Sequence, residues 1–109
     1  MSLALLHDRP MGSATDMVAI GARLRALRLA LSPELGFGQQ SDFARWLGLT
    51  PQSWNNIERG FARPSIDIAR KIRAKTGVSH DWIFEGDDRF LPHHLAVLLD
   101  QVGREARSA

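Results

Sequence analysis

Hydrophobic residues recur every three or four positions along most of this chain, which is the spacing of helices that bury one face. The first such segment starts after Asp16, a residue that suits a helix N-cap. Its apolar face carries Ile20, Leu24, Leu27 and Leu31. Pro33 and two glycines follow, so residues 32–38 are expected to form a loop that ends this helix. Residues 1–15 show no sustained period and are expected to form a flexible N-terminal tail.

The stretch from Gln39 to Gly60 has the pattern of two short helices joined by a tight turn. Gly48 suits the left-handed residue that ends the first helix, and Thr50 suits the N-cap of the second. Pro51 then stands at the first helical position, where its missing N–H costs nothing. The residues expected to face inward are Phe43, Ala44, Leu47, Trp54 and Ile57. The second helix is therefore left with a polar outer surface.

Two further helices are expected after this pair. Ser65 suits the N-cap of a helix that Gly77 ends. Ser79 suits the N-cap of a short helix over residues 80–85. The inward-facing residues of these two helices are expected to be Ile66, Ala69, Ile72, Trp82 and Ile83.

A last helical segment is expected from Phe90 to Arg104, with Pro92 near its start. One face of it carries an apolar stripe formed by Leu95, Leu98, Leu99 and Val102. This stripe either packs on the rest of the same domain or forms a subunit interface, and we favour the interface. Every periodic segment is helical, so the expected fold class is all-α.

Composition narrows the class of protein. The 109 residues are enough for one compact domain with a single core. The absence of cysteine excludes disulfides and cysteine-ligated metal sites and fits a reducing cytoplasm. No apolar run approaches the ~20 residues that span a bilayer, and no secretory leader is recognisable. We therefore expect a cytoplasmic protein that does not enter a membrane.

Charge is unevenly distributed along the chain. The formal net charge is only +2, yet residues 17–77 hold ten basic and four acidic residues, a net charge of +6. Residues 78–100 hold five acidic residues against Arg89 alone. The basic segment suits a polyanion such as nucleic acid, because phosphate neutralisation supplies most non-specific affinity. Composition alone leaves an ordinary solvated surface equally open.

The central stretch resembles the helix-turn-helix of the lambda-repressor/Cro-like, or XRE-type, family. The matching residues are Gln40, the Phe43-Ala44 pair, Leu47 to Thr50, and Ile57 to Gly60. Residues 79–87 resemble the close of the same domain. The resemblance implies a five-helix DNA-binding domain over residues 16–88, with residues 89–109 as an appended C-terminal helix and tail that is a candidate dimerisation element. The alternative is a helical hairpin without such a role.

The outer face of the second helix carries the candidate base contacts. Gln52 and Asn56 are the first candidates, because an amide can donate to and accept from one base, a geometry suited to adenine. Asn55 and Ser53 lie beside them. Pro51 occupies a position where many members of the family place a base-reading polar residue, so we expect an apolar contact there, with a thymine methyl group.

Candidate phosphate contacts surround this face. The resemblance places Gln40 and its helix N-terminus at the DNA backbone, and Arg59 and Arg63 flank the far end. Thr50 and Arg45 complete the set, Arg45 being a weaker candidate. For each of these residues, a capping or solvated role is the alternative.

Residues outside this set have structural expectations. The resemblance implies an ion pair between Arg28 and Glu58, whereas Arg23 is most simply a solvent-facing charge. Phe37 is expected to be a local packing anchor. Trp46 either covers the loop before Gln39 or joins a partner surface.

No constellation for catalysis or metal binding is recognisable. Ser79, His80 and Asp81 include the residue types of a catalytic triad, but three consecutive positions on one helix cannot converge as a triad does. His93 and His94 point about 100° apart, unlike the i, i+4 pair that holds zinc. We expect neither an enzyme nor a cofactor.

The function expected from the sequence is that of a sequence-specific, repressor-like transcriptional regulator of bacterial or phage type. It would bind double-stranded DNA as a homodimer and read the major groove with the helix at about residues 50–59. The alternative is an antitoxin-like or adaptor module that binds a protein partner. The acidic segment 81–88 and the apolar stripe of the C-terminal helix are the reasons to consider it.

Overall fold

The computed structural model describes residues 16–108, and the expected N-terminal tail, residues 1–15, lies outside this range. Six helices and no strands form the described part of the chain. The helices are α2 (Met17–Leu35), α3 (Gln40–Leu47), α4 (Pro51–Glu58), α5 (Ile66–Thr76), α6 (His80–Glu85) and α7 (His93–Ser108). The expected all-α fold class, five helices with an appended C-terminal helix, is confirmed.

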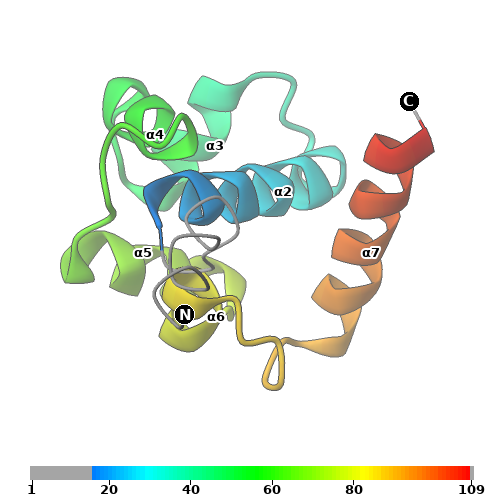
Figure 1. Cartoon of the computed structure of the whole chain (residues 1–109). Helices are drawn as coiled ribbons and strands as arrows, with labels where there is room; N and C mark the ends of the chain where they lie inside the picture. Colours follow the sequence, from blue (N-terminus) through cyan, green and yellow to red (C-terminus); the bar gives the residue numbers. More distant parts are fainter. Residues whose placement is uncertain (1–15, 109) are drawn as a thin grey trace, which may run out of the picture.

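Helix α2 runs through the middle of the molecule, and α3, α4, α6 and α7 all contact it (Figure 1). The face of α2 that carries Ile20, Leu24 and Leu27 is fully buried. One core joins these residues to side chains from every other helix, among them Phe43, Leu47, Trp54, Ile57, Ala69, Ile72, Trp82, Ile83 and Leu95. Helices of six to eleven residues are too short to be stable alone, so this shared core holds α3 to α6 in place.

Side-chain caps set the starts of α2, α4, α5 and α6, as expected. Asp16 accepts a hydrogen bond from the Ala19 amide at 2.7 Å, which fixes the start of α2. Ser65 and Ser79 cap α5 and α6 in the same way, at 3.1 and 3.0 Å. Gly77, which follows α5, is in the left-handed conformation with φ of 84°. These boundaries depend on local chemistry, which the sequence displays directly.

The expected loop over residues 32–38 is wrong, because α2 continues through Pro33 to Leu35. Pro33 lies in the last turn, where it removes only one N–H from the helical ladder. The helix ends instead at Gly36, which is left-handed with φ of 76°. The amide of Phe37 then donates to the Ser32 carbonyl at 2.9 Å, which closes the helix end. The connection to α3 is therefore only residues 36–39.

An aromatic cluster joins this connection to α3. The Phe37 ring packs edge-on against Trp46, with 6.0 Å between ring centroids, and Trp46 also contacts Phe43 at 5.5 Å. The Lys75 ammonium lies over the outer face of Trp46, 5.5 Å from the ring centroid. Phe37 is thus the local anchor expected from the sequence. Of the two roles considered for Trp46, the structure shows the first, since it covers the connection to α3.

Arg23 is not the solvent-facing charge expected from the sequence. Its guanidinium donates to the Ile83 carbonyl from Nε and Nη2, at 3.3 and 3.0 Å. Burial lowers the pKa of Arg23, and the charge of Asp16 opposes that change. Arg23 therefore joins α2 to the short helix α6, and its guanidinium is used in a contact inside the domain.

Helix α5 contributes less apolar surface to the core than expected. Ala69 and Ile72 are fully buried, but Ile66 is 54% exposed. Ile66 is the first residue of α5, and the buried residues of this helix, Ala69 and Ile72, come later in it. The expectation that Ile66 faces inward is wrong.

The C-terminal helix is shifted from its expected bounds of Phe90 to Arg104. It begins at His93, because the Leu91 amide donates to the Asp88 carbonyl and residues 88–91 form a turn. A bidentate hydrogen bond from Arg89 lowers the pKa of Asp87 to about 2, which keeps that carboxylate charged in the segment before α7.

Helix α7 packs on the helix α2 of its own chain. Leu95 is 4% exposed, and Leu99 packs against the same core. The His94 ring lies 2.9 Å from both carboxylate oxygens of Glu34, near the end of α2. The inner part of the apolar stripe is thus used within the chain, and the subunit interface favoured from the sequence can involve only its outer part.

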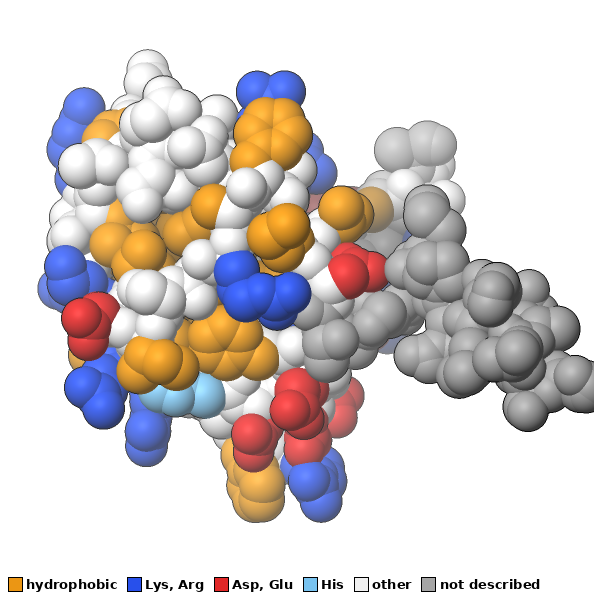
Figure 2. All heavy atoms as spheres, turned by 60° about the vertical axis from the view of Figure 1, so that its left-hand side comes forward, with side chains coloured by type: hydrophobic (Ala, Val, Ile, Leu, Met, Phe, Trp, Pro, Cys, Tyr) orange, Lys and Arg blue, Asp and Glu red, His pale blue; other side chains and the backbone are white. Residues whose placement is uncertain are grey.

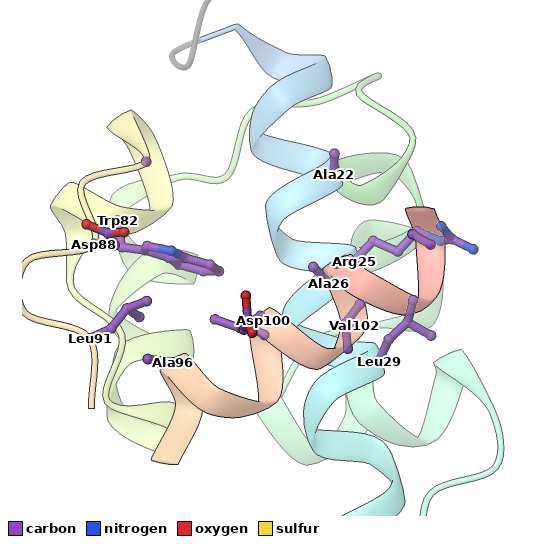
Figure 3. Close-up of a pocket in the computed structure, with 14 residues that line it drawn as sticks. Ala22, Arg25, Ala26, Leu29, Trp82, Asp88, Leu91, Ala96, Asp100 and Val102 are labelled. Carbon is purple, nitrogen blue, oxygen red and sulfur yellow. The ribbon is translucent and has the colours of Figure 1, made fainter. Parts of the chain in front are cut away.

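A groove of about 540 Å³ remains between α2 and α7 (Figure 3). Its walls are mainly small or apolar side chains, with Trp82 and Leu91 at one end and the α2 and α7 residues Ala22, Ala26, Leu29, Ala96 and Val102 along its length. Asp88, Asp100 and Arg25 add charged groups to its lining. None of the residues that line the groove belongs to α3 or α4.

Candidate nucleic-acid interface

Helices α3 and α4 form the tight pair expected from the sequence. Gly48 follows α3 with φ of 86°, and its left-handed conformation turns the chain toward α4. Thr50 is the N-cap of α4 and accepts a hydrogen bond from the Ser53 amide at 3.1 Å. Pro51 is the first helical residue. The Lys71 ammonium of α5 donates to the Gly48 carbonyl at 3.2 Å and braces the turn from outside.

The inner face of α4 is anchored by packing and by one buried carboxylate. Trp54 is fully buried and lies 5.5 Å from the Phe43 ring of α3. Its indole N–H donates to Glu58. The expected pair between Arg28 and Glu58 is present, with the Arg28 guanidinium donating to both carboxylate oxygens at 2.6 and 2.9 Å. Glu58 therefore joins the end of α4 to its own helix and to α2.

Gly21 allows α2 to approach the end of α4 closely, and the sequence reasoning did not identify it. A Cβ atom on Gly21 would lie 2.5 Å from the carbonyl oxygens of both Ile57 and Glu58. Only glycine leaves room for that contact. A glycine inside a helix and next to the buried Ile20 is the signal that could have revealed it.

The outer face of α4 presents uncharged polar groups. Gln52 is exposed, and Ser53, Asn55 and Asn56 are half-buried. The Gln52 amide donates to the Asn56 side-chain carbonyl at 3.1 Å, so the two amides form one unit one helical turn apart. This bond leaves the Gln52 carbonyl oxygen and the Asn56 amide hydrogens directed to outside partners. Pro51, at the start of the same helix, is half-buried.

The candidate phosphate contacts lie at the ends of α3 and α4. Gln40 is the first residue of α3, and the N-cap position belongs to Gln39, which makes no side-chain capping hydrogen bond. Arg59 is the C-cap of α4, and Arg63 follows in the connection to α5, both exposed. Arg45 is exposed on α3.

Basic and acidic side chains occupy different parts of this side of the molecule. In Figure 2 the upper part of the face consists mostly of uncharged polar surface with Lys and Arg at its margins, whereas most acidic side chains lie at the bottom. The acidic residues of α6 and the segment after it, Asp81, Glu85, Asp87 and Asp88, lie at the end remote from α4 (Figure 1). A polyanion would thus meet little repulsion at α4.

The residues considered for catalysis or metal binding do not converge. Ser79 caps α6 through its hydroxyl, and His80 packs edge-on against Phe84 with 6.3 Å between ring centroids. His94 pairs with Glu34. Within residues 16–108, no three His, Asp or Glu side chains are grouped as a metal ion would require. In the same range, no helix combines the length and apolar character needed to cross a bilayer.

Comparison with protein families agrees with this geometry. Residues 38–83 match a family model described as helix-turn-helix, a range that starts just before α3 and ends within α6. This segment is a helix-turn-helix of the lambda-repressor/Cro-like family. No curated protein and no solved structure matched the chain.

The helix-turn-helix family consists of DNA-binding proteins, generally without enzymatic activity. A DNA-binding domain works where DNA is present, which places it in the cytosol or the nucleus. In this helix-turn-helix, α3 is the first helix and α4 is the second.

Proposed function

We propose that the protein is a sequence-specific, repressor-like transcriptional regulator that places α4 in the DNA major groove. The observation that carries this proposal is the outer face of α4, where the hydrogen-bonded amides of Gln52 and Asn56 lie between exposed basic residues. The opposite face of the helix is buried and holds it rigidly. A helix fits a groove about 12 Å wide, and amides can bond to the edges of bases. Uncharged donors and acceptors suit base reading better than a general attraction to phosphate.

Gln52 and Asn56 are the principal base-reading residues in this proposal. Because the Gln52 amide already donates to Asn56, both side chains are ordered before DNA arrives, which lowers the entropy cost of binding. Together they favour an adenine. Asn55 and Ser53 reach neighbouring bases or phosphates, and Pro51 contacts a thymine methyl group.

Phosphate contacts fix the register of the helix on the duplex. The N-terminus of α3, at Gln40, has amide groups without a side-chain cap and can bind a phosphate oxygen. The Thr50 hydroxyl accepts from Ser53 and can still donate to a phosphate. Arg59 and Arg63 bind the backbone at the other end of α4, and Arg45 adds a weaker contact from α3.

Two copies of the chain are expected to bind one operator. A homodimer would place its two α4 helices about 34 Å apart, on one side of a palindromic DNA site. The protein would act on this DNA in the cytoplasm. The outer part of α7 is available for the subunit contact, since Val97 is 44% exposed and Leu98 is half-buried. Residues 89–109 would then serve as the dimerisation element.

The groove between α2 and α7 favours a second candidate function, the antitoxin-like or adaptor module. Its mainly apolar lining, with a few charged residues in it, suits a segment of a protein partner. Such a protein would keep the fold of the DNA-binding family but would not select a duplex sequence. Selection of bound duplexes separates the two functions.

Replacing Arg63 by alanine should weaken binding to all duplex sequences by a similar factor. The logarithm of the binding constant should fall linearly with the logarithm of salt concentration, and the slope should decrease in magnitude by about 0.9 when one phosphate contact is lost. Fluorescence anisotropy at several salt concentrations measures both quantities. Arg25→Ala removes the same charge from the exposed α2 surface beside the groove, which no residue of α3 or α4 lines, and should leave the slope unchanged. Salt-independent binding, or no binding at low salt, would contradict the proposed function.

A further inference from the structure

We propose that Phe61 and Arg59 form one clamp on the DNA backbone, in which the guanidinium binds a phosphate while the Phe61 ring packs on the adjacent deoxyribose. This inference rests on the proposed function and adds to it an apolar contact residue that the sequence reasoning did not consider. The observations that carry it are the position, the exposure and the pairing of these two side chains.

The backbone of Phe61 is fixed to the recognition helix. Its amide donates to the Asn56 carbonyl at 2.9 Å, and the Gly60 amide donates to Ile57 at 3.1 Å. Gly60 has φ of 79°, and a Cβ atom there would lie 3.1 Å from Val18 of α2, so the turn is packed against the domain. The position of the Phe61 side chain is therefore fixed relative to α4.

The Phe61 ring is nevertheless exposed. It retains 63% of its accessible surface and contributes nothing to the core cluster. The guanidinium carbon of Arg59 lies 4.5 Å from the ring centroid, over its face. Cation–π attraction of this kind is modest at an exposed site, but it orders both side chains before any partner is bound.

The chemistry of the pair matches a nucleotide backbone. Each phosphate is covalently joined to a deoxyribose, so a charged group and an apolar ring held 4.5 Å apart can contact both parts of one nucleotide. The pair follows the last residues of α4, beyond the amides at Gln52 and Asn56. Residues that follow the end of a recognition helix no longer reach the base edges and instead face the sugar-phosphate strand that borders the groove. Phe61 thus adds affinity without sequence preference.

Salt dependence separates the two halves of the clamp. Phe61→Ala should weaken binding on the order of tenfold by loss of apolar burial, with the slope against salt concentration unchanged. Arg59→Ala should reduce the magnitude of the slope by about 0.9. Phe61→Leu, which keeps an apolar side chain, should retain most of the affinity. Thermal unfolding should be nearly the same for all three variants, because both side chains are exposed.

Isotope-filtered NMR of the full chain on a duplex chosen by selection gives a direct reading. Nuclear Overhauser effects from the Phe61 ring to deoxyribose protons are expected. Effects only to base protons, an unchanged affinity of Phe61→Ala, or a salt slope altered as in Arg59→Ala would each overturn the clamp. In those cases the wild-type chain still binds DNA, so the proposed function stands. If the wild-type chain binds no duplex at low salt, the proposed function fails and the clamp fails with it.

Discussion

Replacing Glu58 by alanine should lower the free energy of unfolding by about 3 kcal/mol, the cost of removing one partner from a buried ion pair. The Glu58 side chain is 4% exposed and that of Arg28 is 15% exposed, so solvent cannot replace the lost carboxylate well. The variant also leaves the buried Trp54 indole N–H without its acceptor. Urea unfolding followed by tryptophan fluorescence measures the change.

Two variants test whether the effect belongs to this carboxylate. Glu58→Gln keeps an acceptor for Trp54 and should lose less stability than Glu58→Ala. Asp67→Ala removes a carboxylate that is 88% exposed and 3.9 Å from Arg70, and it should change stability by less than about 0.5 kcal/mol. A loss of similar size in Glu58→Ala and Asp67→Ala would show that Glu58 does not join α4 to α2.

Replacing Gly21 by valine should destabilise the fold by about 2–3 kcal/mol through overpacking. The new side chain begins with a Cβ atom 2.5 Å from the Ile57 and Glu58 carbonyl oxygens, and backbone atoms cannot rotate away as a side chain can. Helix α2 and the end of α4 must therefore separate. Because α4 is the proposed recognition helix, DNA affinity should fall as well, even where the variant remains folded.

Alanine at the same position separates steric contact from helix propensity. Gly21→Ala should also destabilise, although alanine favours a helix by about 1 kcal/mol over glycine. Gly103→Ala in α7 is the matched control, since its Cβ would meet only the flexible end of Arg107 at 3.4 Å. The control should be neutral or slightly stabilising by thermal unfolding. Equal behaviour of the two alanine variants would mean that α2 does not contact α4 through Gly21.

Much of the fold could be predicted because helix boundaries are set locally. The caps at Asp16, Thr50 and Ser79 follow from side chains that bond amides three residues on. Pro33 misled the prediction, because a proline ends a helix only where the lost hydrogen bond and ring clash exceed the gain from packing. Which segments are helical was therefore easier to predict than where α2 ends.

Roles that depend on distant partners could not be read from periodicity. Arg23 bonds to a carbonyl 60 residues away, and Gly21 is required by a contact with α4. Phe61 had no predicted role, because its pairing with Arg59 depends on a left-handed turn at Gly60. By contrast, Gln52 and Asn56 could be identified as candidates, since the surface of a short amphipathic helix follows from its buried face.

Selection of bound duplexes from a random pool tests most directly whether α4 reads base sequence. The wild-type chain, Asn56→Ala and Arg63→Ala would be compared under the same salt conditions. The wild-type chain should enrich a palindrome with half-sites about 10 base pairs apart, and Arg63→Ala should enrich the same sequence at lower affinity. Asn56→Ala should lose its preference at one position in each half-site, worth about 1–3 kcal/mol there. Enrichment of no sequence, or the same full sequence from Asn56→Ala, would contradict base reading by α4.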